Sequence, residues 1–204
     1  MKTTTHRTSP TLEVTGQGEQ FPLSFQQERI WVAEKISASE GVYNTPVALR
    51  IEGPVNRELL ESSIALLIDR HETLRTIFIE TSGKQTQVVM PTARASVMEV
   101  DLSGLAAANQ EKTMREILGR RSTAAFDLAQ APLLRTVLVH MGFHSIVLLV
   151  FHHLIFDAGS ISIFLKEFAS SYSDVRVLVD ECLYSKMSPF VRVFQQQLLT
   201  RQSA

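Results

Sequence analysis

Two adjacent histidines, His152 and His153, follow an apolar run at residues 145–151, and Asp157 comes four residues after the second histidine. The run is rich in β-branched and large apolar residues, which is typical of a strand buried on both faces. Because successive strand residues point to opposite faces, only one of the two imidazoles can face a given cavity. Histidine is well suited to moving a proton near neutral pH, so the segment predicts a general base. Taken alone, it also fits two hydrogen-bonded core histidines.

The segment at residues 151–160 resembles the HHxxxDG motif of the condensation domains of nonribosomal peptide synthetases and of related acyltransferases of the chloramphenicol acetyltransferase type. Three further stretches appear in the order and spacing of that family. Residues 24–31 resemble its SxAQxRxW motif, with Gln26 in place of the usual alanine. Residues 70–78 match RHExLRTxF, and residues 126–135 resemble the FDL-x-x-x-PLLR segment that precedes the histidine motif.

This resemblance extends over roughly residues 21–172. A complete condensation domain is about twice as long as this chain and has two similar lobes around an active-site tunnel. The resemblance therefore implies that residues 21–204 form the N-terminal lobe alone, with residues 188–199 as a degenerate form of the helix that leads toward the second lobe.

The second histidine of the motif lies in the family's tunnel, so the resemblance assigns the catalytic role to His153. It would accept the proton of an attacking amine or position that amine. His152 and Asp157 would support the site structurally, with Asp157 ion-paired to an arginine. Arg29 and Arg75 are the local candidates for that arginine, although it could also come from the second lobe.

The reaction implied by the resemblance joins two thioesters that are tethered to partner proteins. The amine of an acceptor aminoacyl thioester attacks a donor acyl thioester, and both are presented by peptidyl or acyl carrier proteins on phosphopantetheine arms. The chain itself is expected to bind no cofactor. A second-lobe chain, or a second copy of this chain in a homo-oligomer, would supply the other wall of the tunnel.

The motif departs from the family at Ala158, which stands where the family has glycine. Ala158, Gly159 and Ser160 are expected to line the substrate tunnel. If the family glycine provides a positive φ or a close approach to the thioester, alanine would strain the turn or narrow the tunnel. Gly159 could absorb that strain one position later.

Two alternatives to a condensation lobe remain open at this point. The first is a non-catalytic interaction module that recruits a carrier protein or a synthetase, which the change at Ala158 and the missing second lobe favour. The second is a small oligomeric CoA-dependent acyltransferase. Against the second, such enzymes keep the histidine motif close to the C-terminus, whereas about 45 residues follow it here.

Composition is that of an ordinary globular protein, with 45% hydrophobic and 20% charged residues and a net charge of -1. This charge offers no basic field for nucleic acid, and no run of about 18 apolar residues predicts a membrane span. The single cysteine, Cys182, excludes an intramolecular disulfide and agrees with a cytoplasmic location. The four histidines at 140, 144, 152 and 153 lack recognised zinc-ligand spacing, so no metal is expected. His140 and His144 bracket a predicted hairpin turn and are expected to be solvated there.

Periodicity divides the chain into a disordered leader at residues 1–20 and one folded unit at residues 21–204. Ser24 and Asn56 are predicted to cap helices that reach residues 37 and 71. Because helices mingle with strands and two hairpins require antiparallel pairing, the predicted fold is α/β, a two-layer α/β sandwich with a mixed sheet. The predicted strands are residues 45–52, 74–80, 85–90, 95–100, 133–140 and 144–152, and the further helices are residues 108–124, 160–173 and 188–201.

Overall fold

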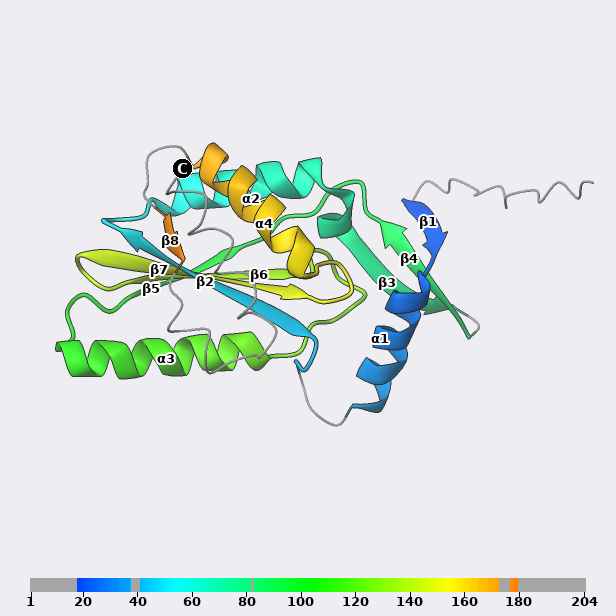
Figure 1. Ribbon diagram of the computed structural model, residues 1–204, viewed down its shortest axis with the longest axis horizontal. Coiled ribbons are helices and arrows are strands. Elements are labelled where there is room, and N and C mark those ends of the chain that lie inside the picture. The colour runs from blue at the N-terminus through cyan, green and yellow to red at the C-terminus, as the bar shows by residue number, and fades with distance from the viewer. Residues whose placement is uncertain (1–17, 38–40, 82, 173–176, 180–204) are drawn as a thin grey trace, which may run out of the picture.

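The computed structural model describes residues 18–37, 41–81, 83–172 and 177–179. Its centre is a five-stranded mixed sheet in the order β5-β6-β7-β2-β8, in which β5 runs parallel to β6 and the other neighbours are antiparallel (Figure 1). The predicted α/β class with a mixed sheet is confirmed. The strand bounds are β2 (Asn44–Glu52), β5 (Val97–Asp101), β6 (Leu134–His140), β7 (His144–His152) and β8 (Val177–Val179).

Strand β7 lies in the middle of this sheet and ends at the histidine motif. Residues 145–152 are all buried, which confirms the strand predicted from the apolar run. A tight turn joins β6 to β7, and Gly142 adopts φ +92 there, a conformation that glycine reaches without steric cost. The histidines thus follow a strand that is buried along almost its whole length, and this packing fixes the position of their backbone.

Helices cover both faces of the sheet. Helix α2 (Arg57–Arg70) and helix α4 (Ala158–Ser171) lie together over one face, and α3 (Ala107–Thr123) covers the opposite face (Figure 1). The sheet and the helices α2 and α4 form the two predicted layers. Helix α3 forms a further layer on the opposite face of the sheet. The Asn56 side chain accepts a hydrogen bond from the Leu59 amide at 2.9 Å, so the predicted cap of α2 is confirmed.

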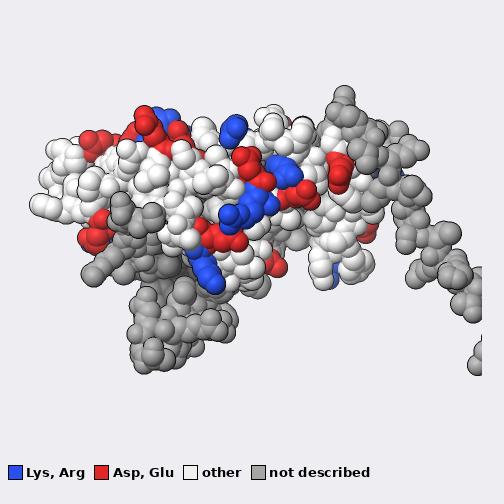
Figure 2. All heavy atoms as spheres, turned by 90° about the horizontal axis from the view of Figure 1, so that it is seen from above, with Lys and Arg blue, Asp and Glu red and all other residues white. Residues whose placement is uncertain are grey.

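Ion pairs fasten α2 to α4. Glu167 of α4 accepts from Arg70 at 3.1 Å, and its carboxylate lies 2.8 Å from His71 at the end of α2. Figure 2 shows acidic and basic side chains interspersed across the face that carries these two helices. Beneath them, Phe168 is fully buried and stacks against Phe164 and Tyr172.

A smaller sheet in the order β1-β4-β3 lies beside the main one, with helix α1 (Phe25–Ile36) next to it (Figure 1). It consists of β1 (Glu19–Pro22), β3 (Thr76–Thr81) and β4 (Lys84–Val89), all antiparallel. Ser24 and Gln27 form a reciprocal capping box at the start of α1, as predicted for Ser24.

Two boundaries around the small sheet differ from the predictions. Strand β3 begins at Thr76 because residues 72–75 form a 3₁₀ turn, Glu72–Arg75, between α2 and the strand. The leader predicted to end at residue 20 is shorter within the described residues, since Glu19 already pairs with Val89 in the small sheet. The predicted helix at residues 188–201 and the rest of the leader lie outside the described residues.

Candidate active site

His153 is exposed and lines an open cavity of about 560 Å³ that three separate parts of the chain border. Helix α1 forms one wall, the turn into β2 forms another, and the first turn of α4 forms a third. This volume is typical of a small-molecule site. The lining residues are Gln26, Arg29, Ile30, Ala33, Val42, Tyr43, Asn44, Thr45, Pro46, His153, Ala158 and Ile161.

Main-chain carbonyl groups hold His153 at two points. Its amide donates to the Tyr43 carbonyl at 2.8 Å, and its Nδ1 lies 2.8 Å from the Phe156 carbonyl oxygen. A carbonyl oxygen can only accept, so Nδ1 must carry the proton in this contact. The neutral imidazole then has its lone pair on Nε2, which is the form that a general base requires.

His152 lies in different surroundings, packed inside the protein. It is 1% exposed, its Nδ1 accepts from the Leu154 amide at 3.2 Å, and its ring meets Phe126 edge-on. Burial, with a smaller contribution from the neighbouring His153, lowers the pKa of His152 to about 4. The two histidines thus face different surroundings, as strand alternation predicts, and the buried one stays neutral near pH 7.

A buried carboxyl group faces His152 without bonding to it. Glu34 Oε2, on α1, lies 3.9 Å from His152 Nε2, and neither atom has a hydrogen-bond partner among the described residues. Burial raises the pKa of Glu34. Helix α1, which carries Glu34, also forms a wall of the cavity. The contact between Glu34 and His152 therefore joins this wall to the histidine motif.

Asp157 serves as the N-cap of α4. Its Oδ1 accepts from the Ser160 amide at 2.8 Å and from the Ser160 hydroxyl at 2.7 Å, and these bonds lower the pKa of Asp157. The expected ion pair with a local arginine is not formed: within the described residues, neither Arg29 nor Arg75 pairs with it. Arg75 instead donates to the Met90 carbonyl at 2.9 Å and pairs with a glutamate of its own 3₁₀ turn, so it fixes the entry into β3.

Ala158 occupies the first turn of α4 and lines the cavity. Alanine adopts the helical conformation without strain, so the condition for backbone strain, a positive φ, is not met at this position. Gly159 is also helical and has no strain to absorb, and a side chain there would meet only Asp157 Oδ1 at 3.5 Å. Within the described residues, Gly159 and Ser160 are not among those that line the cavity, and Ser160 instead completes the cap of α4.

A turn at residues 41–44 also positions His153, and sequence reasoning missed it. Gly41 has φ +68, and an added Cβ would lie 2.2 Å from the Thr123 carbonyl oxygen at the end of α3. The Asn44 amide group donates to the Ser122 and Ala124 carbonyls at 2.7 and 2.8 Å. These contacts fix the turn whose Tyr43 carbonyl holds His153. The glycine was the only signal in the sequence.

Arg135 belongs to the PLLR segment, and its role was also missed. Its guanidinium donates to the carbonyls of Arg121, Ala124 and Ala125 at 2.8, 3.2 and 3.0 Å and lies over the Phe126 ring. Burial lowers its pKa. Arg135 therefore binds the C-terminal end of α3 beside the carbonyls that Asn44 reaches.

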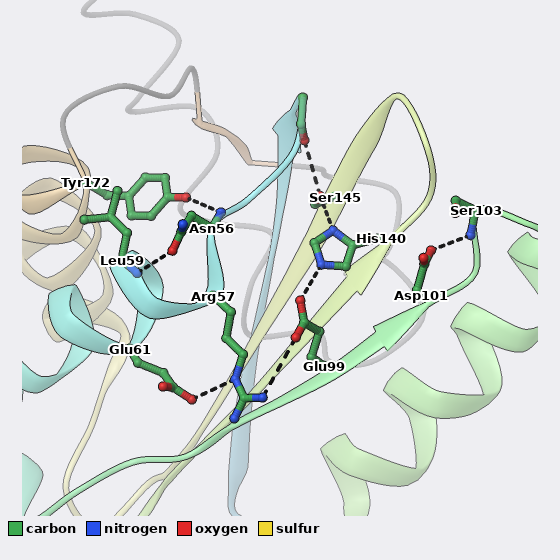
Figure 3. A network of polar contacts seen from close by, with 11 residues as sticks. Asn56, Arg57, Leu59, Glu61, Glu99, Asp101, Ser103, His140, Ser145 and Tyr172 are labelled. Carbon is green, nitrogen blue, oxygen red and sulfur yellow. Dashed lines mark hydrogen bonds and ion pairs between the residues drawn. The ribbon is translucent and has the colours of Figure 1, made fainter.

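A second polar cluster lies at the far end of β7 (Figure 3). His140 Nε2 is 2.8 Å from Glu99 and its Nδ1 is 3.3 Å from the Ser145 hydroxyl, with Arg57 pairing to the same glutamate at 3.9 Å. The expectation that His140 is simply solvated is wrong, because it bridges β5 and β7. His144 and the motif histidines are separated by the length of β7, about 26 Å.

Within the described residues, none of the helices is long and apolar enough to cross a membrane.

Comparison with known proteins agrees with the sequence resemblance. A profile of the condensation domain family matches residues 17–178. Malpinin synthetase of Mortierella alpina is 38% identical over 154 residues, 75% of this chain and 2% of that protein. A linear gramicidin synthase protein of Brevibacillus parabrevis is 38% identical over 153 residues, 74% of this chain and 3% of that protein.

Solved structures show the same fold. The starter condensation domain of rhizomide synthetase RzmA has a TM-score of 0.68 at 24% identity, covering 75% of this chain and 37% of that chain. The first condensation domain of the CDA synthetase also has a TM-score of 0.68, at 21% identity, covering 75% of this chain and 39% of that one. The chain belongs to the condensation domain family, and it spans less than half of the solved domains that it matches.

Proposed function

We propose that this chain provides the catalytic half of an amide-forming site that acts on thioesters carried by peptidyl or acyl carrier proteins. The observation behind the proposal is the contact between His153 Nδ1 and the Phe156 carbonyl, which places the lone pair of the neutral imidazole on Nε2 in a cavity of suitable size. A cytoplasmic location is part of the proposal and is supported by the low cysteine content.

The reaction needs one base at the attacking nitrogen. The acceptor amine attacks the thioester carbonyl, a C–N bond forms, and the C–S bond breaks. His153 Nε2 takes the proton that the nitrogen loses and returns it to the departing thiolate. The phosphopantetheine arm supplies the thiol and belongs to the partner carrier protein, so the chain needs only to admit it.

A second lobe, from another chain or another copy of this one, would close the site. Helix α1, beside His153, exposes Phe25, Val32 and Ile36 by 71%, 52% and 77%. Their spacing of seven and four residues places them along one side of the helix. Val42, at the cavity itself, is 57% exposed, and apolar surface of this kind marks a site of association.

An amide-forming assay tests the proposal. An acyl-loaded carrier protein and an amine acceptor are offered to the chain, alone and with chains that encode a second lobe. The turnover of His153→Ala is expected to fall by about 10² to 10⁴-fold while circular dichroism shows an intact fold. Unchanged turnover in His153→Ala would refute the role of His153. If the chain binds acyl-pantetheine but transfers nothing with any partner, a non-catalytic binding module is the better description.

A further inference from the structure

The cavity around His153 contains one permanently charged side chain, Arg29 of α1, and none of its described lining residues is acidic. The walls near it are largely apolar and include Ile30, Ala33 and Ile161. Such a cavity suits a ligand with an apolar body and an anionic group, because the apolar walls can pack against the body while the exposed guanidinium of Arg29 can pair with the anion.

Arg29 is also free to bind a ligand. Among the described residues it makes no ion pair or hydrogen bond, in contrast to Arg75 and Arg135, which donate to main-chain carbonyls. Asp157, the partner expected from the motif, directs its carboxylate to Ser160 instead. The guanidinium of Arg29 therefore keeps its donors for another group.

We propose that Arg29 binds an oxyanion on the thioester ligand, and so selects ligands that carry one within reach of His153. A guanidinium matches carboxylate and phosphate groups because its planar donors can bond both oxygens at once. The oxyanion is either a carboxylate on the acyl group or the phosphodiester of the pantetheine arm. This inference rests on the proposed function, since it assumes that thioesters enter this cavity.

Binding of three probes to the whole chain separates these sources. Pentanoyl-pantetheine carries neither anion, glutaryl-pantetheine adds a terminal carboxylate, and pentanoyl-phosphopantetheine adds a phosphate. Affinities come from calorimetry, and the imidazole NMR signals of His153 report whether each probe enters the cavity. At least one anionic probe is expected to bind about three- to tenfold more tightly than the neutral probe.

Two variants on the same helix test the assignment to Arg29. Arg29→Gln should abolish the preference for the anionic probe, and Arg29→Lys should keep part of it. Lys35→Gln is the matched control, because Lys35 loses the same charge but lies over the Trp31 ring and outside this cavity. Its preference is expected to equal that of the wild type. The exposed position of Arg29 makes a folding defect in these variants unexpected, and circular dichroism checks it.

The outcomes separate this inference from the proposed function. Equal affinity for all three probes, or equal losses in Arg29→Gln and Lys35→Gln, would overturn the role of Arg29 while leaving thioester binding intact. If none of the probes binds or shifts the His153 signals, the proposed function fails, and this inference fails with it.

Discussion

Protonation of the buried His152 should make the stability of this fold fall in mild acid. Burial lowers the pKa of His152 to about 4 in the folded protein, whereas an unfolded histidine titrates near 6.5. Below about pH 6.5 the unfolded chain therefore binds a proton that the folded chain does not accept until about pH 4. Stability from the neutral ring is present above pH 6.5 and is lost as the pH falls toward 4.

The size of the effect follows from the same two values. A pKa difference of about 2.5 corresponds to about 3 kcal/mol in total, of which about 2 kcal/mol is lost between pH 7.5 and pH 5. Glu34 acts in the opposite direction. Burial raises its pKa, so the folded state binds a proton at this carboxyl more readily than the unfolded state does, and stability gains as the pH falls.

Urea unfolding at pH 7.5 and pH 5.0 measures the difference. His152→Asn keeps an acceptor near Nδ1 for the Leu154 amide but cannot take up a proton, so its loss of stability between the two pH values should be smaller by about 2 kcal/mol. Glu34→Gln should instead steepen the loss, because the opposing contribution is gone. If wild type and His152→Asn show the same pH dependence, the reasoning from burial of the ring is wrong.

Three further predictions concern the elements around the site, each measured as the free energy of unfolding in urea. Gly41→Ala should cost about 2 to 3 kcal/mol, since the new Cβ meets a carbonyl oxygen at 2.2 Å. Gly142→Ala, also at a positive φ but with open space around it, should cost only about 1 kcal/mol. Equal costs would contradict the steric argument. Asn56→Ala should remove the cap of α2 and cost about 1 kcal/mol, with Asn56→Asp close to wild type; no difference between them would refute the role of the cap. Ala158→Gly should destabilise the fold by about 0.5 kcal/mol, because it places glycine in a helix; a gain in stability would show strain at Ala158.

Much of this fold could be predicted from local sequence patterns. The largely apolar run before the histidines became β7, and the caps at Ser24 and Asn56 start helices where expected. These signals succeed because they depend on neighbours within a few residues, namely alternation along a strand and side chains that reach the first free amides of a helix.

The rest of the site depended on contacts between distant segments. Asp157 was expected to pair with an arginine, but a serine three residues away satisfies it through a cap. The carboxyl of Glu34 meets His152 only because α1 packs beside the end of β7, and no local pattern places that helix. Gly41 is informative in the same way, since the carbonyl that excludes a side chain there lies more than 80 residues away in the sequence.

The hydrogen bonds between His153 and main-chain carbonyls have a consequence for how the specificity of the proposed site could change. The Phe156 carbonyl oxygen accepts from the ring and fixes its tautomer, and the Tyr43 carbonyl oxygen accepts from the main-chain amide of His153. Substitution of the side chains at those two positions leaves both acceptors in place. The side chains that shape the cavity are thereby separated from the main-chain groups that orient His153. Under the proposed function, substitutions at Gln26, Val42 or Ile161 can reshape the walls for other acyl groups while the backbone keeps the neutral ring in the tautomer with its lone pair on Nε2.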